Sequence, residues 1–273
     1  YLVYASAWLK VRKPEDFYAG VLAAQPMGFW SPQSLVADAL RHGVRVLPAD
    51  INRSLAQATV EQWEDHQDAD RSDQWGPLRP HPAAPSALDV HDDLAVRLGL
   101  APLKGLGERA AQAIVTERRA HGPYRDLADL ARRVSLSRSR LEALAVSGAL
   151  DSLGTERRQA LWAAGVLSDE HGRRRGTSHQ GRGAWCQPTL PGTAVGARAP
   201  TLPAMTDRER QGADLSLTGV STHGSPLRLL RPALAADGVL SAADLSGQEH
   251  GSRVRVAGVV THRQRPHTAS GMI

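Results

Sequence analysis

The stretch Leu103-Lys-Gly-Leu-Gly-Glu-Arg-Ala-Ala-Gln-Ala-Ile-Val115 carries the strongest local signal in this chain of 273 residues. A tight glycine–leucine–glycine turn leads into a segment in which Ile114 and Val115 stand at core spacing for a helix. We therefore expect a helix from Gly107 to Arg119 that is entered through the turn. The pattern is typical of a helix-hairpin-helix.

The turn has the chemistry of a phosphate-binding loop. Gly105 and Gly107 leave backbone N–H groups uncovered, and the helix that follows adds its positive N-terminus. We predict a DNA-binding site formed by Lys104, Gly105, Leu106, Gly107 and Arg109, in which the two cations neutralise phosphate charge. Such a site contacts no base, so binding is sequence-independent and sensitive to salt. The alternative is a glycine-capped turn between packed helices, with Lys104 merely solvated.

The sequence on both sides of the turn is also helical. Residues 101–165 continue with a helix over Asp126 to Val134, one N-capped by Ser137 and one capped by Thr155. Residues 1–25 favour two helices, the second of which starts at Pro14.

A third N-terminal helix begins after Ser31, which is its N-cap, and a short strand over Val44–Leu47 follows it. Trp8 and Trp30 lie among apolar neighbours at helical spacing, so we expect both side chains in the core. The whole pattern predicts a mainly α fold with a small α/β part.

The C-terminal part changes in character. Residues 168–205 are polar and rich in Gly, Pro and Arg, which indicates a linker. Thr206 and Glu209 form a capping box that restarts a helix.

The best strand candidate runs from Arg253 to His262, where basic and apolar residues alternate. We expect Val254 and Val256 to face inward and Arg253 and Arg255 outward. The segment looks like the first strand of an OB barrel, a fold that commonly binds single-stranded nucleic acid. Arg253, Arg255 and Arg263 are therefore further predicted DNA-binding residues, although a plain edge strand would give the same local pattern.

Composition excludes some classes of protein. The net charge is +5, which suits a polyanionic partner without proving one. No apolar run is long enough to span a membrane, and no secretory signal is present. The single cysteine, Cys186, fits a reducing cytoplasm, where we place the protein.

The sequence predicts no catalytic residue and no metal site in this chain. Transfer of a nucleotide by two metal ions needs carboxylates clustered on a rigid sheet. The densest acidic segment, residues 61–92, is rich in proline and favours a loop, so His66, His81 and His91 within it are more simply solvated than ligating. There is also no nucleophile elbow and no Walker A loop. The chain starts within an expected helix and stops within an expected strand, so we interpret it as a fragment.

Several stretches resemble, in family order, the bacterial DNA polymerase III alpha subunits, the C-family polymerases. They are Tyr4-Ala-Ser-Ala-Trp-Leu-Lys10, Pro14-Glu-Asp-Phe-Tyr-Ala-Gly-Val-Leu22, Gly43-Val-Arg-Val-Leu-Pro-Ala-Asp-Ile-Asn52, Gly99-Leu-Ala-Pro-Leu-Lys-Gly-Leu-Gly107, Gly122-Pro-Tyr-Arg-Asp-Leu-Ala-Asp-Leu130 and Leu141-Glu-Ala-Leu-Ala-Val-Ser-Gly-Ala-Leu-Asp151. The tail, in Ala199–Met205 and Val256–Pro266, looks like the error-prone, damage-tolerant branch. Gln187-Pro-Thr-Leu-Pro-Gly192 lacks the aromatic residue of the replicative branch's clamp-binding peptide, which supports the same branch.

The resemblance implies five segments. They are the end of the fingers domain (1–60), an acidic loop and strand connector (61–100), the helix-hairpin-helix DNA-binding region (101–165), a flexible linker (166–205), and a helical connector with a truncated OB-fold domain (206–273).

The resemblance also implies a parent enzyme that extends a primer on template DNA from deoxynucleoside triphosphates, in error-prone translesion synthesis during DNA repair. Its Mg²⁺ ligands lie in a palm outside this chain, and the fragment alone is inactive. Accessory translesion proteins supply an indirect link to the sliding clamp. The alternatives are a non-enzymatic DNA-binding adaptor, the tail of a repair nuclease or ligase, and a purely structural helical domain.

Overall fold

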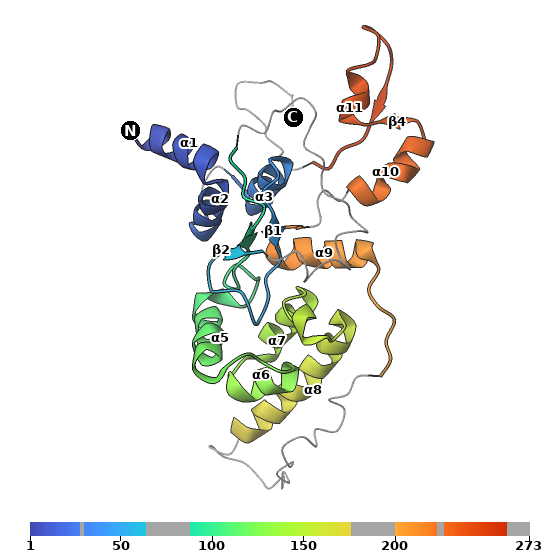
Figure 1. Ribbon diagram of the computed structural model, residues 1–273. Helices are drawn as coiled ribbons and strands as arrows, with labels where there is room; N and C mark the ends of the chain where they lie inside the picture. The colour runs from blue at the N-terminus through green and yellow to red at the C-terminus, as the bar shows by residue number, and fades with distance from the viewer. Residues whose placement is uncertain (28–29, 64–87, 176–199, 223–226, 261–273) are drawn as a thin grey trace, which may run out of the picture. The chain divides into compact units, whose positions relative to one another are not determined.

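The computed structural model describes residues 1–27, 30–63, 88–175, 200–222 and 227–260. The chain divides into two compact units, Tyr1–His223 and Gly224–Ile273. The first unit holds a small mixed sheet and most of the helices, and the predicted mainly α fold with a small α/β part is confirmed. Figure 1 shows the element order along the chain.

The sheet of the first unit has three short strands and is covered by two helices. The strands are β1 (Val46–Leu47), β2 (Thr59–Gln62) and β3 (Leu94–Arg97), in the order β1-β3-β2, with β3 parallel to β1 and antiparallel to β2. α2 (Pro14–Ala23) and α3 (Pro32–Arg41) pack on it. The buried cluster that joins them comprises Tyr18, Ala19, Leu22, Leu35, Val36, Ala39, Val44, Val46, Val96 and Val220.

The helix starts of this region follow the sequence prediction. Pro14 is the first residue of α2, where its missing N–H is not needed. The Ser31 side chain accepts a hydrogen bond from the backbone N–H of Ser34 and so caps α3. α1 (Leu2–Arg12) precedes them and has no buried residue.

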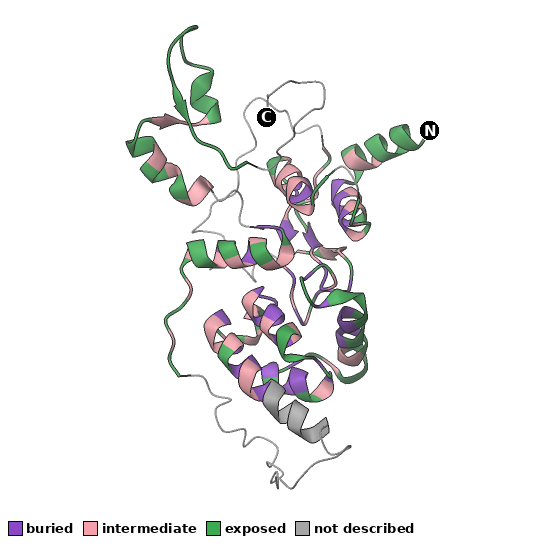
Figure 2. Ribbon diagram, turned by 180° about the vertical axis from the view of Figure 1, so that it is seen from behind, coloured by how far each residue is buried: buried purple, intermediate pink, exposed green. Residues whose placement is uncertain are grey.

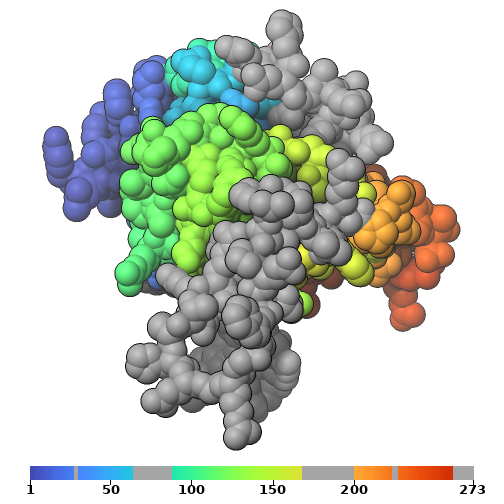
Figure 3. Space-filling view, turned by 90° about the horizontal axis from the view of Figure 1, so that it is seen from below, coloured from blue at the N-terminus to red at the C-terminus, as the bar shows by residue number. Residues whose placement is uncertain are grey.

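The second half of the first unit is a helical body with its own core. It contains α5 (Gly107–His121), α6 (Leu127–Arg133), α7 (Arg138–Val146), the 3₁₀ turn Asp151–Leu153 and α8 (Arg157–Arg175). Their inner faces, purple in Figure 2, share one cluster in which Ile114, Leu130 and Leu144 are fully buried. Figure 3 shows one face of this body from below, where its green and yellow-green residues lie next to one another.

Helix α9 (Asp207–Thr218) belongs to the same unit, and a capping box at Thr206 and Glu209 starts it, as predicted. The second unit holds α10 (Leu227–Ala236), β4 (Val239–Leu240), α11 (Ala242–Leu245) and β5 (Arg255–Val256), with β4 parallel to β5. The Ser241 side chain caps α11.

The prediction of a buried Trp8 and Trp30 is wrong. Their side chains are 53% and 60% exposed, and α1 shows as mostly green in Figure 2. Helical spacing identifies a face of a helix, but nothing within the described chain covers the face of α1 that carries Trp8.

The C-terminal predictions need correction as well. Helix α8 continues to Arg175, so the predicted linker start at residue 166 lies inside a helix, and the rest of that segment falls largely outside the described residues. The predicted strand over 253–262 is reduced to Arg255–Val256 among the described residues. Val254 and Val256 are 41% and 61% exposed, so neither faces a core. With only two residues in each strand, the pair formed by β4 and β5 is too short to bury a face.

Gly99 lies where residues 98–101 cross residues 54–57, and this crossing leaves no room for a side chain. A Cβ atom on Gly99 would sit 2.4 Å from the Ala56 carbonyl oxygen and 2.5 Å from the Gln57 carbonyl carbon. Both are backbone atoms, and the Ala101 N–H donates to that same Ala56 oxygen, so the neighbour is held in place.

We expect Gly99→Ala to lower the free energy of unfolding by about 1–3 kcal/mol or more, because overpacking against backbone forces the two segments apart. Urea denaturation of the purified chain measures this. Gly20→Ala is the matched control, since Gly20 is exposed in α2 with no atom within 4 Å of its Cβ position. That change should stabilise by up to about 1 kcal/mol through helix propensity. Equal effects of the two substitutions would contradict the prediction.

Candidate nucleic-acid interface

The predicted hairpin turn is present, and its glycines have the conformation that the sequence implied. Gly105 and Gly107 have φ angles of 87° and 74°, a region that only glycine adopts readily. Leu103 and Leu106 are 2% and 1% exposed and anchor the turn in the core of the helical body. The arm before the turn is a series of tight turns over residues 101–106 rather than a regular helix.

Some backbone N–H groups of the turn donate hydrogen bonds within the protein, and others have no partner among the described residues. The Lys104 N–H donates to the Leu217 carbonyl at 2.8 Å, and the Leu106 N–H donates to the Leu103 carbonyl at 3.0 Å. Those of Gly105, Gly107 and Glu108 have no partner among the described residues. These three groups lie at the N-terminus of α5, where the helix dipole adds positive potential. An anion with several oxygens is the ligand that such an arrangement suits.

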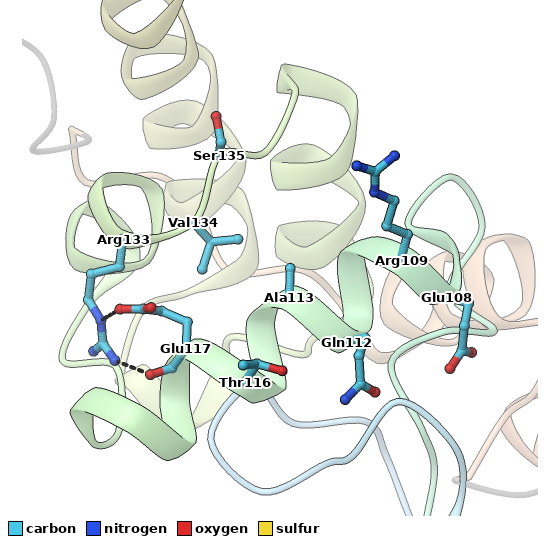
Figure 4. A pocket seen from close by; sticks show the side chains of 9 residues that line it. All are labelled: Glu108, Arg109, Gln112, Ala113, Thr116, Glu117, Arg133, Val134 and Ser135. Atoms are coloured by element: carbon cyan, nitrogen blue, oxygen red, sulfur yellow. Dashed lines mark hydrogen bonds and ion pairs between the residues drawn. The ribbon is translucent and has the colours of Figure 1, made fainter.

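The two cations beside the turn are available to a ligand. Lys104 and Arg109 are exposed, and neither forms an ion pair with a described residue. Glu108 lies between them in sequence, and it accepts a hydrogen bond of 2.6 Å from the Gln57 side-chain amide. Glu108 and Arg109 point to opposite sides of α5 (Figure 4). The carboxylate is therefore held away from the side to which Arg109 points.

Arg109 opens onto a groove of about 950 Å³ between α5 and the turn that joins α6 to α7. The lining residues are Glu108, Arg109, Gln112, Ala113, Thr116, Glu117, Arg133, Val134 and Ser135, all shown in Figure 4. Polar groups that carry no charge, on Gln112, Thr116 and Ser135, provide hydrogen-bonding capacity along it.

The far end of the groove is already neutralised. Arg133 contacts Glu117 at 3.2 Å and Asp129 at 3.1 Å. Burial lowers the pKa of Arg133, but Glu117 and Asp129 outweigh that effect, so the pKa is raised. Burial raises the pKa of Asp129, but the Arg125 N–H and the two arginines lower it more, and the net direction is down. Of the cations that line the groove, Arg109 is the one without an ion-pair partner among the described residues.

The support of the turn includes residues that the sequence did not single out. Arg118, on α5, donates to the Ile51 carbonyl at 2.6 Å and to the Ser54 carbonyl at 2.8 Å. Tyr124 donates from its hydroxyl to the Ile114 carbonyl at 2.8 Å, and burial raises the pKa of Tyr124 to about 12. The Arg118 contacts fix α5 to the loop that follows β1, and the Tyr124 contact ties the segment after α5 back onto that helix. No local pattern marks the Arg118 contacts, because their partners stand more than 60 residues away along the chain.

The other predicted DNA-binding residues lie elsewhere. Arg253 and Arg255 belong to the second unit and are exposed at β5. Arg263 falls outside the described residues, as do His66 and His81 of the acidic segment. His91 is described, and its ring Nδ1 lies 3.2 Å from a carboxylate oxygen of buried Glu15.

The described residues contain no group of three or more His, Cys, Asp or Glu side chains placed to hold a metal ion. None of the described helices is both long and apolar enough to cross a membrane.

Comparison with known proteins agrees with this geometry. The helix-hairpin-helix motif family matches residues 43–160. The chain is 43% identical over 271 residues to an error-prone DNA polymerase of Corynebacterium diphtheriae, 44% over 272 residues to one of Corynebacterium efficiens and 42% over 271 residues to one of Mycobacterium tuberculosis. Each alignment covers 99% of this chain and 21% of the relative. The chain thus spans about a fifth of the length of the curated relatives it matches.

Proposed function

We propose that this chain, which belongs to the same protein family as the error-prone DNA polymerases, holds the DNA backbone for a DNA-directed DNA polymerase. The observation that carries the proposal is the set of uncommitted N–H groups at Gly105, Gly107 and Glu108, flanked by Lys104 and Arg109. Kinship with polymerases supports this function over an adaptor, a nuclease or a ligase.

In the proposed mechanism, one phosphate of the DNA backbone accepts hydrogen bonds from the N–H groups of the turn. Lys104 and Arg109 neutralise that phosphate and its neighbour, and they release counterions as they do so. The groove beside Arg109 gives the backbone a path along α5. Because every proposed contact is to phosphate, the site binds DNA of any sequence. The protein can therefore stay bound as synthesis advances along the template.

The chemistry itself is proposed to lie outside this chain. Primer extension from deoxynucleoside triphosphates uses Mg²⁺ held by clustered carboxylates. The described residues offer no such cluster, so no step of nucleotide transfer is assigned to them. We place the whole enzyme in the cytoplasm, in translesion synthesis during DNA repair, with accessory proteins that link it indirectly to the sliding clamp.

The second unit is proposed to add a weaker contact to single-stranded DNA. Arg253 and Arg255 are exposed and stand two positions apart in the chain, and Arg263 follows in sequence. An OB barrel that begins at this strand would give these residues a binding face. The contact is independent of the hairpin, because the residues belong to a separate unit.

Charge reversal at the hairpin tests the proposal. The double variant Lys104→Glu/Arg109→Glu should bind primer–template DNA about tenfold or more weakly at low salt, whatever the sequence. The slope of log Kd against log salt concentration should fall by about two, since two phosphate contacts are lost. Fluorescence anisotropy at several salt concentrations measures both quantities.

The matched control is Lys13→Glu/Arg208→Glu, which changes the net charge equally at exposed positions on α1–α2 and α9. It should leave the slope close to that of the unmodified chain. An unchanged slope in the hairpin variant would place the DNA contact elsewhere. A primer-extension assay should show no extension by this chain, and extension would contradict the proposed location of the carboxylates.

A further inference from the structure

We propose that α9 and the turn that follows it, Thr218–Ser221, are the positioning element of the DNA-binding hairpin. The segment follows the hairpin by about a hundred residues, yet it makes a direct backbone contact with it. The part of the inference that concerns DNA rests on the proposed function.

The contact is between two groups that each need a partner. The last carbonyl groups of a helix accept no hydrogen bond from an N–H group of the same helix. The Leu217 carbonyl, at the end of α9, is one of these groups. It accepts the Lys104 N–H at 2.8 Å. This hydrogen bond fixes the peptide that enters the turn, and it leaves the following N–H groups for a phosphate.

The end of α9 is itself fixed by a side-chain hydroxyl. Thr218 Oγ1 lies 2.7 Å from the carbonyl oxygens of Asp214 and Val220, and it accepts the Val220 N–H at 2.9 Å. Gly219 then reverses the chain with a φ of 68°. Thr218 and Val220 line a small, mostly apolar cavity together with Pro102 and Leu103.

Two more contacts anchor this segment to both halves of the first unit. Asp214 accepts a hydrogen bond of 2.6 Å from Arg157 of α8, and both side chains are buried. The Ser221 N–H donates to the Gln33 side chain of α3 at 2.6 Å. Val220 belongs to the buried cluster that joins the sheet to α2 and α3. Because α9 contacts both cores, displacement of its end would displace the hairpin turn with it.

The test compares three substitutions on α9. Thr218→Val removes the hydroxyl at nearly constant volume, Thr218→Ser retains it, and Ser216→Ala removes an exposed hydroxyl that bonds only within the helix, to the Ala213 carbonyl. NMR-detected hydrogen exchange of the Lys104 amide reports the contact directly, with the Ile114 amide in the same α5 core as reference. Anisotropy titrations against primer–template DNA report the consequence.

We expect Thr218→Val to speed exchange at Lys104 by about fivefold, the equivalent of one lost hydrogen bond, with Ile114 unchanged. DNA binding should weaken by a similar factor at an unchanged salt slope, since both cations remain. Thr218→Ser and Ser216→Ala should match the unmodified chain. Asp214→Asn, which loosens the anchor to α8, should raise exchange at Lys104 as well.

Unchanged exchange at Lys104 in both Thr218→Val and Asp214→Asn would overturn the inference. Faster exchange with unchanged DNA affinity would overturn its DNA-binding part. If the unmodified chain binds no DNA, the proposed function fails, while the exchange result still decides whether α9 positions the turn.

Discussion

Replacement of Arg157 by methionine should lower the free energy of unfolding by about 3–5 kcal/mol, because it leaves the buried Asp214 carboxylate without its cation. Arg157 is 7% exposed, and its guanidinium contacts Asp214 at 2.6 Å and Asp151 at 3.4 Å. Burial lowers the pKa of Arg157, but Asp151 and Asp214 raise it more, so the net shift is upward. Urea denaturation followed by circular dichroism measures the loss.

The fold makes room for this arginine. Gly148 has a φ of 79°, and a Cβ atom there would lie 2.2 Å from the Arg157 guanidinium nitrogen. The same guanidinium donates to the Val146 carbonyl at 3.3 Å. The end of α7, the start of α8 and the middle of α9 therefore meet at one buried charge.

Two comparisons make the Arg157 experiment decisive. Arg158→Ala removes the neighbouring arginine, whose ion pair with Glu209 is exposed, and should cost less than about 1 kcal/mol. The double variant Arg157→Met/Asp214→Leu removes both charges of the pair and should recover part of the stability. A loss for Arg157→Met no larger than that for Arg158→Ala would show that the buried pair contributes little.

Patterns that depend on adjacent residues were predictable from the sequence. The capping residues Ser31 and Thr206, the first-turn Pro14 and the glycines of the hairpin act within a few residues, so their spacing determines what they do. The start and end of α5 and α6 follow from the same local signals, within two residues.

Features that depend on distant partners were not predictable. Spacing showed that α1 has an apolar side near Trp8, but whether another segment covers that side is a tertiary fact. Strand β2 was missed because the strand with which it pairs, β3, stands far along the chain, and because the residues of β2 are only partly buried. The support of the candidate site also depends on a distant partner. No residue near Lys104 in the sequence indicates that the Lys104 N–H donates a hydrogen bond to the Leu217 carbonyl.

The residue that best tests the helical body beneath the hairpin is Ile114. The sequence predicted it at a core position of α5, and its side chain is 0% exposed in the cluster that also holds Leu103 and Leu106. Ile114→Ala should lower the free energy of unfolding by about 2–5 kcal/mol, because it removes buried methyl groups and leaves a cavity. Urea denaturation measures the loss.

Gln112→Ala is the matched control for Ile114→Ala, since Gln112 is exposed on the same helix and alanine suits a helix at least as well. It should change stability by no more than about 0.5 kcal/mol. Loss of core packing also predicts that the folded Ile114→Ala chain keeps the salt slope of DNA binding, because Lys104 and Arg109 are still present. A destabilisation below about 1 kcal/mol would mean that α5 is held by its polar contacts through Arg118 and Tyr124 rather than by this core.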